Sequence, residues 1–324
     1  MVSLGSRARA LFARLWRNDA RLTATAAVML VALAACGVGL LVDQRVVLGA
    51  PVWLKPAKFA ISIAVYCLTL AAVFESIPSF VRTRRRVGSV TAVAMLVEMV
   101  IISGQAARGT TSHFNVSTPF DATLFAIMGV AIITQTLSTV AVAVALFRQR
   151  FEDPSLGWSL RLGLVLAIAG ASLGGVMTRP TRAQLDDMSQ GRVAVSGAHT
   201  VGAPDGGAGM PGTGWSREHG DLRAPHFFGL HALQILPLIA LGLRRTSLGS
   251  EKRTRLVVTF AASYGAFVGI LCWQALSGRP LFAPDAGGLA ALVAWFGMTL
   301  LFIQQACMRN APASPATLHP ARST

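Results

Sequence analysis

Long runs of apolar residues alternate with short polar segments along almost the whole chain. A helix rises about 1.5 Å per residue, so about 20 consecutive apolar residues are needed to cross the roughly 30 Å hydrocarbon core of a bilayer. Eight runs meet this requirement. They predict eight transmembrane helices, at residues 22–42, 58–78, 88–106, 122–147, 158–178, 225–243, 256–276 and 287–307.

The composition supports an all-α integral membrane protein. Hydrophobic residues make up 53% of the chain and charged residues only 13%, and the mean hydropathy is +0.56. Soluble domains contain about 25% charged residues. Helices are expected because a backbone exposed to lipid must satisfy its own hydrogen-bonding groups, and the apolar runs are too long for barrel strands.

The positive charges gather in one set of loops, which predicts the orientation. Arginine and lysine favour the cytoplasmic side of short membrane loops, and here they concentrate in the N-terminal segment, the second, fourth and sixth loops and the tail. We therefore expect both termini in the cytoplasm. The excess of arginine over lysine and the abundant alanine are typical of a GC-rich bacterium, so the expected location is the bacterial inner (cytoplasmic) membrane. The formal net charge of +15 then reflects topology and attraction to anionic lipids, not nucleic-acid binding.

The first apolar run contains "LAAC", Leu33 to Cys36, after a basic segment. This resembles the cleavage site of a bacterial lipoprotein signal, and cleavage there would leave seven spans. The apolar run continues to Val42, whereas the apolar region of a signal peptide ends after about 7 to 15 residues. We therefore prefer a retained helix. The remaining cysteines lie inside predicted spans and predict no disulfide framework: Cys67, Cys272 and Cys307.

An offset of 169 residues relates polar positions in the two halves of the chain. Pro56 of "KPAKF" matches Pro225 of "APHFF", and Gln105 of "GQAARG" matches Gln274 of "WQALSG". Further on, "PFDATLFAIM" matches "APDAGGLAAL", with five fewer residues in the second copy. The pattern predicts two parallel four-helix repeats, as found in some transporters.

The predicted organisation follows from the spans and the repeat. The long loop is rich in glycine through "VGAPDGGAGMPGTG", where we expect mobility, and its end is dense in polar side chains. The segments are a cytoplasmic basic N-terminus (1–21), a first four-helix unit (22–147), a cytoplasmic linker (148–157), a second four-helix unit (158–307) with an extracytoplasmic loop (179–224), and a disordered cytoplasmic tail (308–324).

Two ionisable residues inside predicted spans mark a candidate site. Glu98 lies two helical turns before Gln105, on the same face and roughly 10 Å below the outer end of its helix. His231 follows Pro225 by six residues and lies about 9 Å deep. An ionisable group in a transmembrane helix is costly and indicates function by default. Equal depth makes Glu98 and His231 candidate partners, as catalytic groups or as a proton-linked pair, and Gln234 extends the polar face inward.

Further polar residues gather at the expected extracytoplasmic loops. Lysine and arginine supply charge-assisted donors, and arginine suits bidentate capture of a carboxylate or phosphate. The sequence predicts a polar pocket open to that side and lined by the second, third, sixth and seventh helices. Its candidate ligand-binding residues are Lys55, Lys58, Gln105, Arg108, His113, Asn115, Arg217, Glu218, His219, Asp221, Arg223, His226, Gln234, Gln274, Arg279 and Asp285.

Several of these residues also have a structural interpretation. Lys55 and Lys58 can extend to the lipid headgroups. Glu98 can be a protonated carboxyl that is hydrogen-bonded between helices. Pairs that would instead anchor loops or cap a helix are Arg108 with Asp121, Arg279 with Asp285, and His226 with Glu218 or Asp221.

Three functions use this chemistry. The leading hypothesis is binding or transport of a small anionic molecule through the outward-facing pocket. The alternative is a membrane enzyme, an oxidoreductase or hydrolase, with haem or a divalent metal at His113, His226 and His231. His226 and His231 are five residues apart, about 140° around a helix, so they do not form a chelating pair of adjacent turns. The third is a structural or assembly protein that docks a protein partner through the loop at 179–224.

Four stretches carry a resemblance: "WLKPAKF", "QAARGTTSHFN", "GWSREHGDLRAPHF" and "GRPLFAPD". Together they look like a set of uncharacterised bacterial polytopic membrane proteins, over most of the chain outside the tails. The resemblance implies eight spans and brings no function with it. The predicted architecture is also similar to haem A synthase, which has two parallel four-helix units with histidines on the outer side. This chain has no histidine in its last predicted helix and lacks the motifs of that family.

Overall fold

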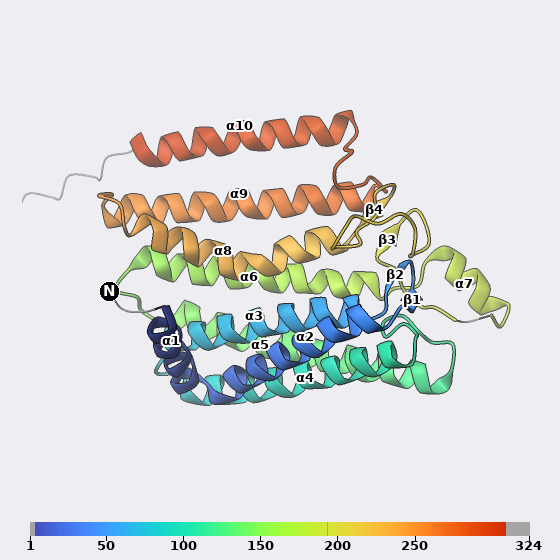
Figure 1. Ribbon diagram of the computed structural model, residues 1–324. Helices are drawn as coiled ribbons and strands as arrows, with labels where there is room; N and C mark the ends of the chain where they lie inside the picture. The colour runs from blue at the N-terminus through green and yellow to red at the C-terminus, as the bar shows by residue number, and fades with distance from the viewer. Residues whose placement is uncertain (1–3, 193, 309–324) are drawn as a thin grey trace, which may run out of the picture.

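The computed structural model is a bundle of eight long helices, and it describes residues 4–192 and 194–308 (Figure 1). Each long helix is apolar enough to cross a membrane, so the eight predicted spans are confirmed and the chain is a multi-pass membrane protein. The eight helices are α2 (Ala20–Val42), α3 (Leu54–Glu75), α4 (Val81–Ala107), α5 (Pro119–Arg148), α6 (Pro154–Met177), α8 (Arg223–Leu243), α9 (Ser250–Leu276) and α10 (Ala286–Met308). α2 runs unbroken through Cys36, so both sides of "LAAC" belong to one helix.

The bundle has two chemically different ends because successive helices alternate in direction (Figure 1). We call the end that holds the connections 76–80, 149–153 and 244–249 the arginine-rich end. The opposite end, the loop end, holds the connections 43–53, 108–118, 178–222 and 277–285. That the arginine-rich end faces the cytoplasm stays a prediction, and most of the predicted tail, residues 309–324, lies outside the described residues.

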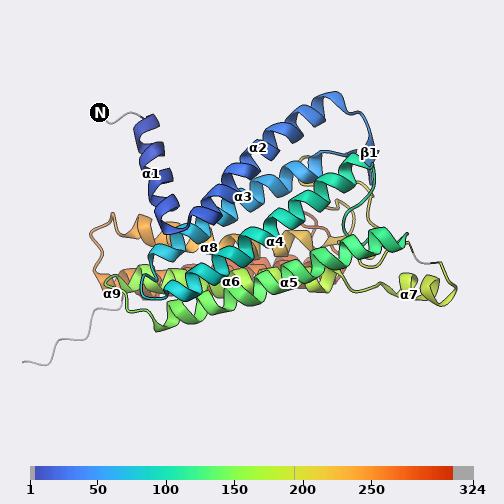
Figure 2. The same cartoon turned by 90° about the horizontal axis from the view of Figure 1, so that it is seen from below.

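The N-terminal segment forms a helix that the pattern of apolar runs did not predict. α1 (Leu4–Asn18) is too short and too charged to cross a membrane, and it runs at a steep angle to the long helices (Figure 2). Leu11, Phe12 and Trp16 are exposed along it, and an ion pair of 2.7 Å joins Arg14 to Glu75 at the end of α3. Aromatic and basic residues on one short helix suit the interface between lipid and water.

Small elements shape the loop end. Strands β1 (Val46–Val47) and β2 (Ala50–Pro51) form one antiparallel pair, and β3 (Thr200–Val201) and β4 (Gly220–Asp221) form another. The long loop also contains α7 (Arg182–Ser189), which begins with a capping box between Thr181 and Gln184. These short elements carry little hydrophobic periodicity, which explains why the sequence did not predict them.

The two halves of the bundle use the same packing order. In the first half α2 packs on α3 and α4, and α4 also packs on α3 and α5. In the second half α6 packs on α8 and α9, and α9 also packs on α8 and α10. α4 and α9 are each followed by a glycine in the same backbone conformation. These glycines, Gly109 and Gly278, are related by the 169-residue offset and have φ of +72° and +73°. The residue after each glycine donates its backbone N–H to the carbonyl of Gln105 or Gln274.

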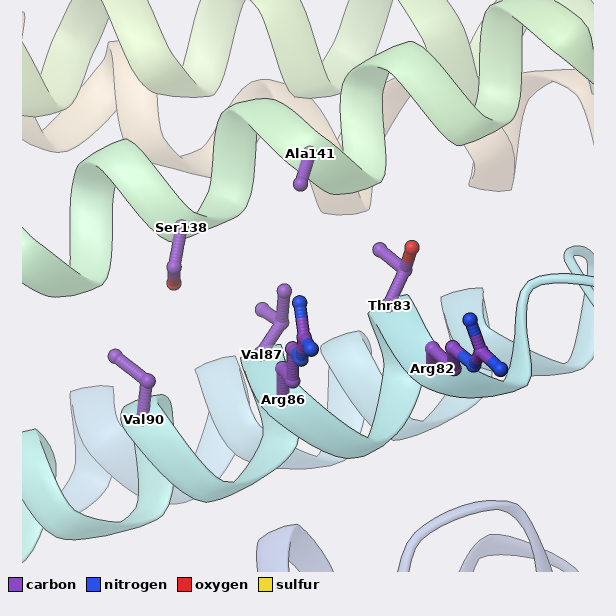
Figure 3. Close-up of a pocket in the computed structure, with 7 residues that line it drawn as sticks. All are labelled: Arg82, Thr83, Arg86, Val87, Val90, Ser138 and Ala141. Atoms are coloured by element: carbon purple, nitrogen blue, oxygen red, sulfur yellow. The ribbon is translucent and has the colours of Figure 1, made fainter.

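The helices are held together by a buried apolar core and by close contacts between small residues. The largest buried side chains of the main core include Phe74, Leu22 and Leu70. Where α6 crosses α8, an added Cβ on Gly170 would come within 2.6 Å of the Gly229 backbone. Such contacts let transmembrane helices pack closely without a hydrophobic driving force. At the arginine-rich end a cavity of about 270 Å³ separates α4 from α5 (Figure 3).

Candidate functional site

Glu98 is buried within α4 without a hydrogen bond. Its side chain is 2% exposed, and neither carboxylate oxygen has a hydrogen-bond partner in the described part of the chain. The Nε2 atom of His113 lies 4.0 Å from Oε2 of Glu98, and Lys55, in the first turn of α3, interacts electrostatically with the same carboxylate. An ionised carboxylate buried without hydrogen bonds is costly, so a neighbouring cation, a proton or a ligand must balance its charge.

His113 is presented to Glu98 by the loop between α4 and α5. The Oγ atom of Ser112 lies 3.1 Å from His113 Nδ1, and the ring packs against Phe59 at a centroid distance of 5.5 Å. Phe114 adopts a positive φ of 64°, which turns the chain immediately after the histidine. Burial lowers the pKa of His113 well below its ordinary value, and the positive charges of Lys55 and His199 act in the same direction.

The predicted residue Asn115 holds this loop in shape. Its amide donates to the Thr110 hydroxyl and to the Thr111 carbonyl, at 3.2 Å each. Its oxygen accepts hydrogen bonds from the backbone and the hydroxyl of Ser117. Asn115 is itself buried, so it positions His113 through the backbone.

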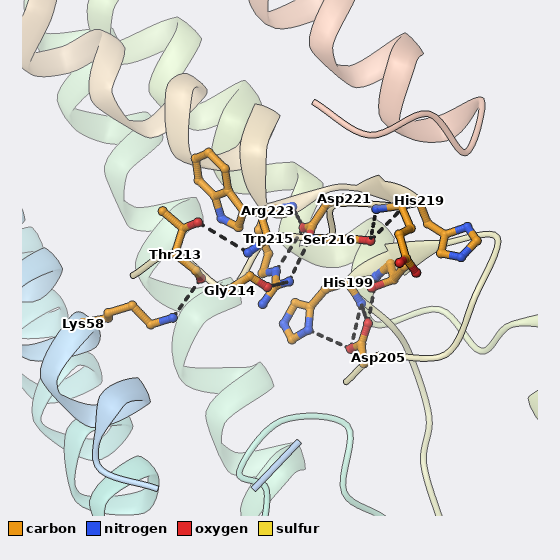
Figure 4. Close-up of polar contacts among 12 residues, drawn as sticks. Lys58, His199, Asp205, Thr213, Gly214, Trp215, Ser216, His219, Asp221 and Arg223 are labelled. Atoms are coloured by element: carbon orange, nitrogen blue, oxygen red, sulfur yellow. Dashed lines mark hydrogen bonds and ion pairs between the residues drawn. The ribbon is translucent and has the colours of Figure 1, made fainter. Parts of the chain in front are cut away.

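His199 and Asp205 form a second pair near His113, and the sequence did not predict either residue as part of the site. Asp205 accepts hydrogen bonds from the backbone N–H of His199 and of Thr200, and it lies 2.8 Å from His199 Nδ1 (Figure 4). The His199 ring lies 4.8 Å from the Phe114 ring between centroids, and the two rings are tilted by 57°. Burial lowers the pKa of His199 despite the hydrogen bond that its ring donates to Asp205. The pair lies in a glycine-rich stretch, and only the isolated histidine and aspartate of "AHTVGAPD" signal it.

We expect His113 and His199 to lower the thermal stability of the solubilised protein as the pH falls from about 7.5 to about 5.5. The pKa of His113 and of His199 lies below its ordinary value in the folded protein. The unfolded chain, in which histidine titrates near 6.5, therefore binds protons in this window that the folded protein does not bind. The stability that these two histidines contribute is thus full above about pH 6.5 and is lost below it.

The double variant His113→Gln/His199→Gln should lose most of this dependence. Each histidine contributes up to about 1.4 kcal/mol per pH unit between its two pKa values. Melting curves of the wild type and the double variant at both pH values are the measurement. An equal loss of stability on acidification in the two proteins would contradict the prediction.

The stretch "GWSREHGDLR" folds into a tight turn over the start of α8. Asp221 accepts hydrogen bonds from the backbone of Ser216 and from the guanidinium group of Arg223, at 2.7 and 2.6 Å (Figure 4). Arg223 also donates to the Gly214 carbonyl. Lys58 donates to the Thr213 carbonyl at 2.9 Å and so ties the turn to α3.

The outer side of this turn carries the other predicted residues of the loop. Arg217 and Glu218 are exposed, and His219 is partly buried and donates its backbone N–H to the Ser216 hydroxyl. The glycine-rich segment before them has a defined hydrogen-bonded path, because Gly209 bridges to Ser216. None of these three side chains reaches Glu98 through a hydrogen bond or ion pair within the described residues.

Two predicted arginines anchor loops, as the structural interpretation expects. Arg108 forms an ion pair of 2.6 Å with Asp121, and Gln105 donates to the same carboxylate at 2.8 Å. In the second half Arg279 lies 3.4 Å from Asp285. The Gln274 side chain donates instead to the backbone carbonyls of Pro280 and Leu281.

His231 does not pair with Glu98 in the described part of the chain, which differs from the partnership expected from equal depth. The Nδ1 atom of His231 lies 2.8 Å from the Phe227 carbonyl of its own helix, and its ring stacks on the Phe227 ring. The depth of a residue along its helix sets its height in the membrane, but not the neighbouring helix that its side chain faces. α8 packs on α6 and α9, whereas α4 packs on α3 and α5. Gln234, one turn further, contacts Thr69 of α3 at 3.2 Å.

The three candidate metal ligands have three different partners. His226 Nδ1 lies 2.8 Å from the Gly170 carbonyl, where α8 crosses α6. His113 faces Glu98, and His231 faces its own helix. Among the described residues, no group of three or more histidine, cysteine, aspartate and glutamate side chains is arranged to hold a metal ion.

Comparison with known proteins returned no match to a family model, to a curated protein or to a solved structure. The resemblance noted from the four sequence stretches therefore identifies no family. The class of the protein rests on its own structure: within the described residues, eight long apolar helices form the bundle of a multi-pass membrane protein.

Proposed function

We propose that this membrane protein binds a small anionic molecule at the loop end and carries it across the bilayer together with a proton. The observation that carries the proposal is the buried carboxylate of Glu98, which has no hydrogen bond and lies 4.0 Å from His113. Lys55 supplies the nearby positive charge. We call these three residues the loop-end cluster.

The charges of the loop-end cluster couple an anion to a proton. While Glu98 is ionised, its charge balances that of Lys55. An anion that binds beside Lys55 would be repelled by the carboxylate, because like charges at short range in a low dielectric interact strongly. Binding therefore requires that Glu98 take up a proton, and release of the proton expels the anion. His113, the nearest imidazole, is the group through which the proton reaches Glu98.

The surroundings of the cluster support access from the loop end. Lys55 and His113 are partly exposed, whereas Glu98 is buried beneath them. Segment 194–196 of the long loop hydrogen-bonds to the backbone on both sides of Asn115 and so lies beside the loop that carries His113. An incoming ligand would pass this segment. The matching packing order of the two halves supports the two parallel repeats expected from the sequence, an architecture used by transporters.

The test is anion-induced stabilisation of the purified protein in detergent. We expect acetate, succinate or inorganic phosphate to raise the melting temperature, and more so at about pH 5.5 than at about pH 7.5, because binding takes up a proton. An anion at about ten times its Kd stabilises the folded state by about 1.4 kcal/mol. Comparison with the anion-free protein at the same pH separates this effect from acid destabilisation.

Lys55→Met should abolish the stabilisation by anions, because it removes the charge that attracts them. The matched control is Lys58→Met, one turn along α3, since Lys58 donates to the Thr213 carbonyl and lies outside the cluster. The proposal fails if the wild type responds to none of the three anions, or if the two lysine variants respond alike.

One observation favours the alternative of a membrane enzyme. The Asp205 carboxylate lies 2.8 Å from Nδ1 of His199 and so orients this imidazole, as a carboxylate orients a general base in many hydrolases. His199, together with the loop-end cluster, would then act on a substrate instead of transporting it. Chemical analysis of a stabilising anion after incubation with the protein separates the two functions, because a transporter returns it unchanged.

A further inference from the structure

A groove between α4 and α5 opens at the arginine-rich end of the bundle. The loop-end cluster lies at the other end. Its volume is about 270 Å³ (Figure 3). Its lining includes two arginines and two valines from α4, and a serine and an alanine from α5. These six residues are Arg82, Arg86, Val87, Val90, Ser138 and Ala141.

The two arginines of the groove have no acidic partner within the described residues. Arg82 and Arg86 are one helical turn apart and both are exposed. Three other arginines of the same end form ion pairs: Arg14 pairs with Glu75, Arg21 with Asp19, and Arg244 with Asp153. Two adjacent guanidinium groups without a carboxylate attract a phosphate group strongly.

The groove changes from charged to apolar along the helix. Arg82 lies in the first turn of α4, and Val90 lies eight residues further in, about 12 Å along the helix axis. Val87 and Val90 face Ala141 of α5 across the gap (Figure 3). A phospholipid has the same order of chemistry, with a phosphate at the membrane surface and acyl chains below it. The Ser138 hydroxyl donates to its own helix and adds no competing charge.

We propose that the α4–α5 groove binds one anionic phospholipid, with its phosphate on Arg82 and Arg86 and the upper part of an acyl chain along Val90 and Ala141. Basic pockets between transmembrane helices are suited to such headgroups. A volume of about 270 Å³ corresponds to roughly nine water molecules, so the groove holds the phosphate and the first methylenes while the rest of the lipid lies in the bilayer. Inorganic phosphate would leave the apolar half unused.

The experiment measures retention of added lipid by the purified protein with native mass spectrometry. The probes are phosphatidylglycerol, phosphatidylcholine and inorganic phosphate. We expect the wild type to retain one phosphatidylglycerol at least tenfold more tightly than phosphatidylcholine. The variant Arg82→Gln/Arg86→Gln should lose this preference at least tenfold. The control Arg245→Gln/Lys252→Gln removes two charges from the same end, outside the groove, and should behave as the wild type does.

A second variant tests the apolar half of the groove. Ala141→Leu adds bulk where the acyl chain is placed and leaves both arginines intact, so it should also weaken phosphatidylglycerol binding. Both altered arginines and Ala141 are exposed, which keeps the core unchanged, and the melting temperature without lipid verifies the fold. The proposal is overturned if the arginine variant keeps the preference, if both lipids bind alike, if inorganic phosphate displaces the lipid completely, or if Ala141→Leu binds as the wild type does.

Discussion

Replacing Glu98 with glutamine is expected to make anion binding independent of pH and to abolish proton uptake on binding. The amide has the shape of the protonated carboxyl and carries no charge, so the variant resembles the anion-accepting state at every pH.

The measurement combines melting curves with proton uptake in weakly buffered solution. It uses whichever of acetate, succinate and inorganic phosphate stabilises the wild type most. The matched control is Glu75→Gln, which makes the same substitution at the arginine-rich end, where the carboxylate pairs with Arg14. In reconstituted vesicles, Glu98→Gln should bind the anion but no longer move protons with it. Persistence of pH-dependent binding in Glu98→Gln would rule out this carboxylate as the proton carrier.

Gly170→Ala is expected to destabilise the protein by about 1–3 kcal/mol, because the crossing of α6 and α8 has no room for a methyl group. A Cβ on Gly170 would meet the backbone of Gly229 at 2.6 Å, and backbone atoms cannot move aside as a flexible side chain can. The two helices would have to separate. The separation would also strain the contact between His226 and the Gly170 carbonyl.

The control for this substitution lies on the same helix. A Cβ on Gly175 meets nothing within 4 Å, so Gly175→Ala should be neutral or stabilising by up to about 1 kcal/mol through its higher helix propensity. Thermal or denaturant unfolding in detergent compares the two variants with the wild type. Equal effects of Gly170→Ala and Gly175→Ala would show that helix packing at the crossing does not limit stability.

The spans were predictable because a membrane imposes a length and a polarity on each helix. All eight predicted segments lie within or largely overlap the observed helices. α1 was missed because its apolar residues, such as Leu11 and Trp16, are interrupted by arginines at helical spacing and never form a long run. The predicted repeat offset relates Gln105 to Gln274, and both end their helices with the same glycine turn, but their side chains have different partners.

The sequence predicted how deep the residues of the candidate site lie in the bundle, but not which side chains face one another. Glu98 stood out because a carboxylate within an apolar helix is rare, and the structure describes it as buried. Its partner could not be chosen by height alone, since helix rise carries no information about which faces meet. His113 approaches Glu98 only because the loop turns sharply at Phe114. His199 was missed because its position depends on hydrogen bonds from the backbone to Asp205, which leave no periodic trace in the sequence.

The short pairing between segments 114–116 and 194–196 has a mechanical consequence. The backbone N–H of Val116 donates to the carbonyl of Ala194, and that of Ser196 donates to the carbonyl of Phe114. One of these two paired segments follows α4, and the other precedes α8. Any rocking of one half of the bundle against the other at this end must first break these two bonds. Because His113 immediately precedes the paired segment 114–116, the same movement would pull the imidazole away from Glu98. If the protein carries a proton as proposed, opening of the loop end and separation of His113 from Glu98 would then occur together.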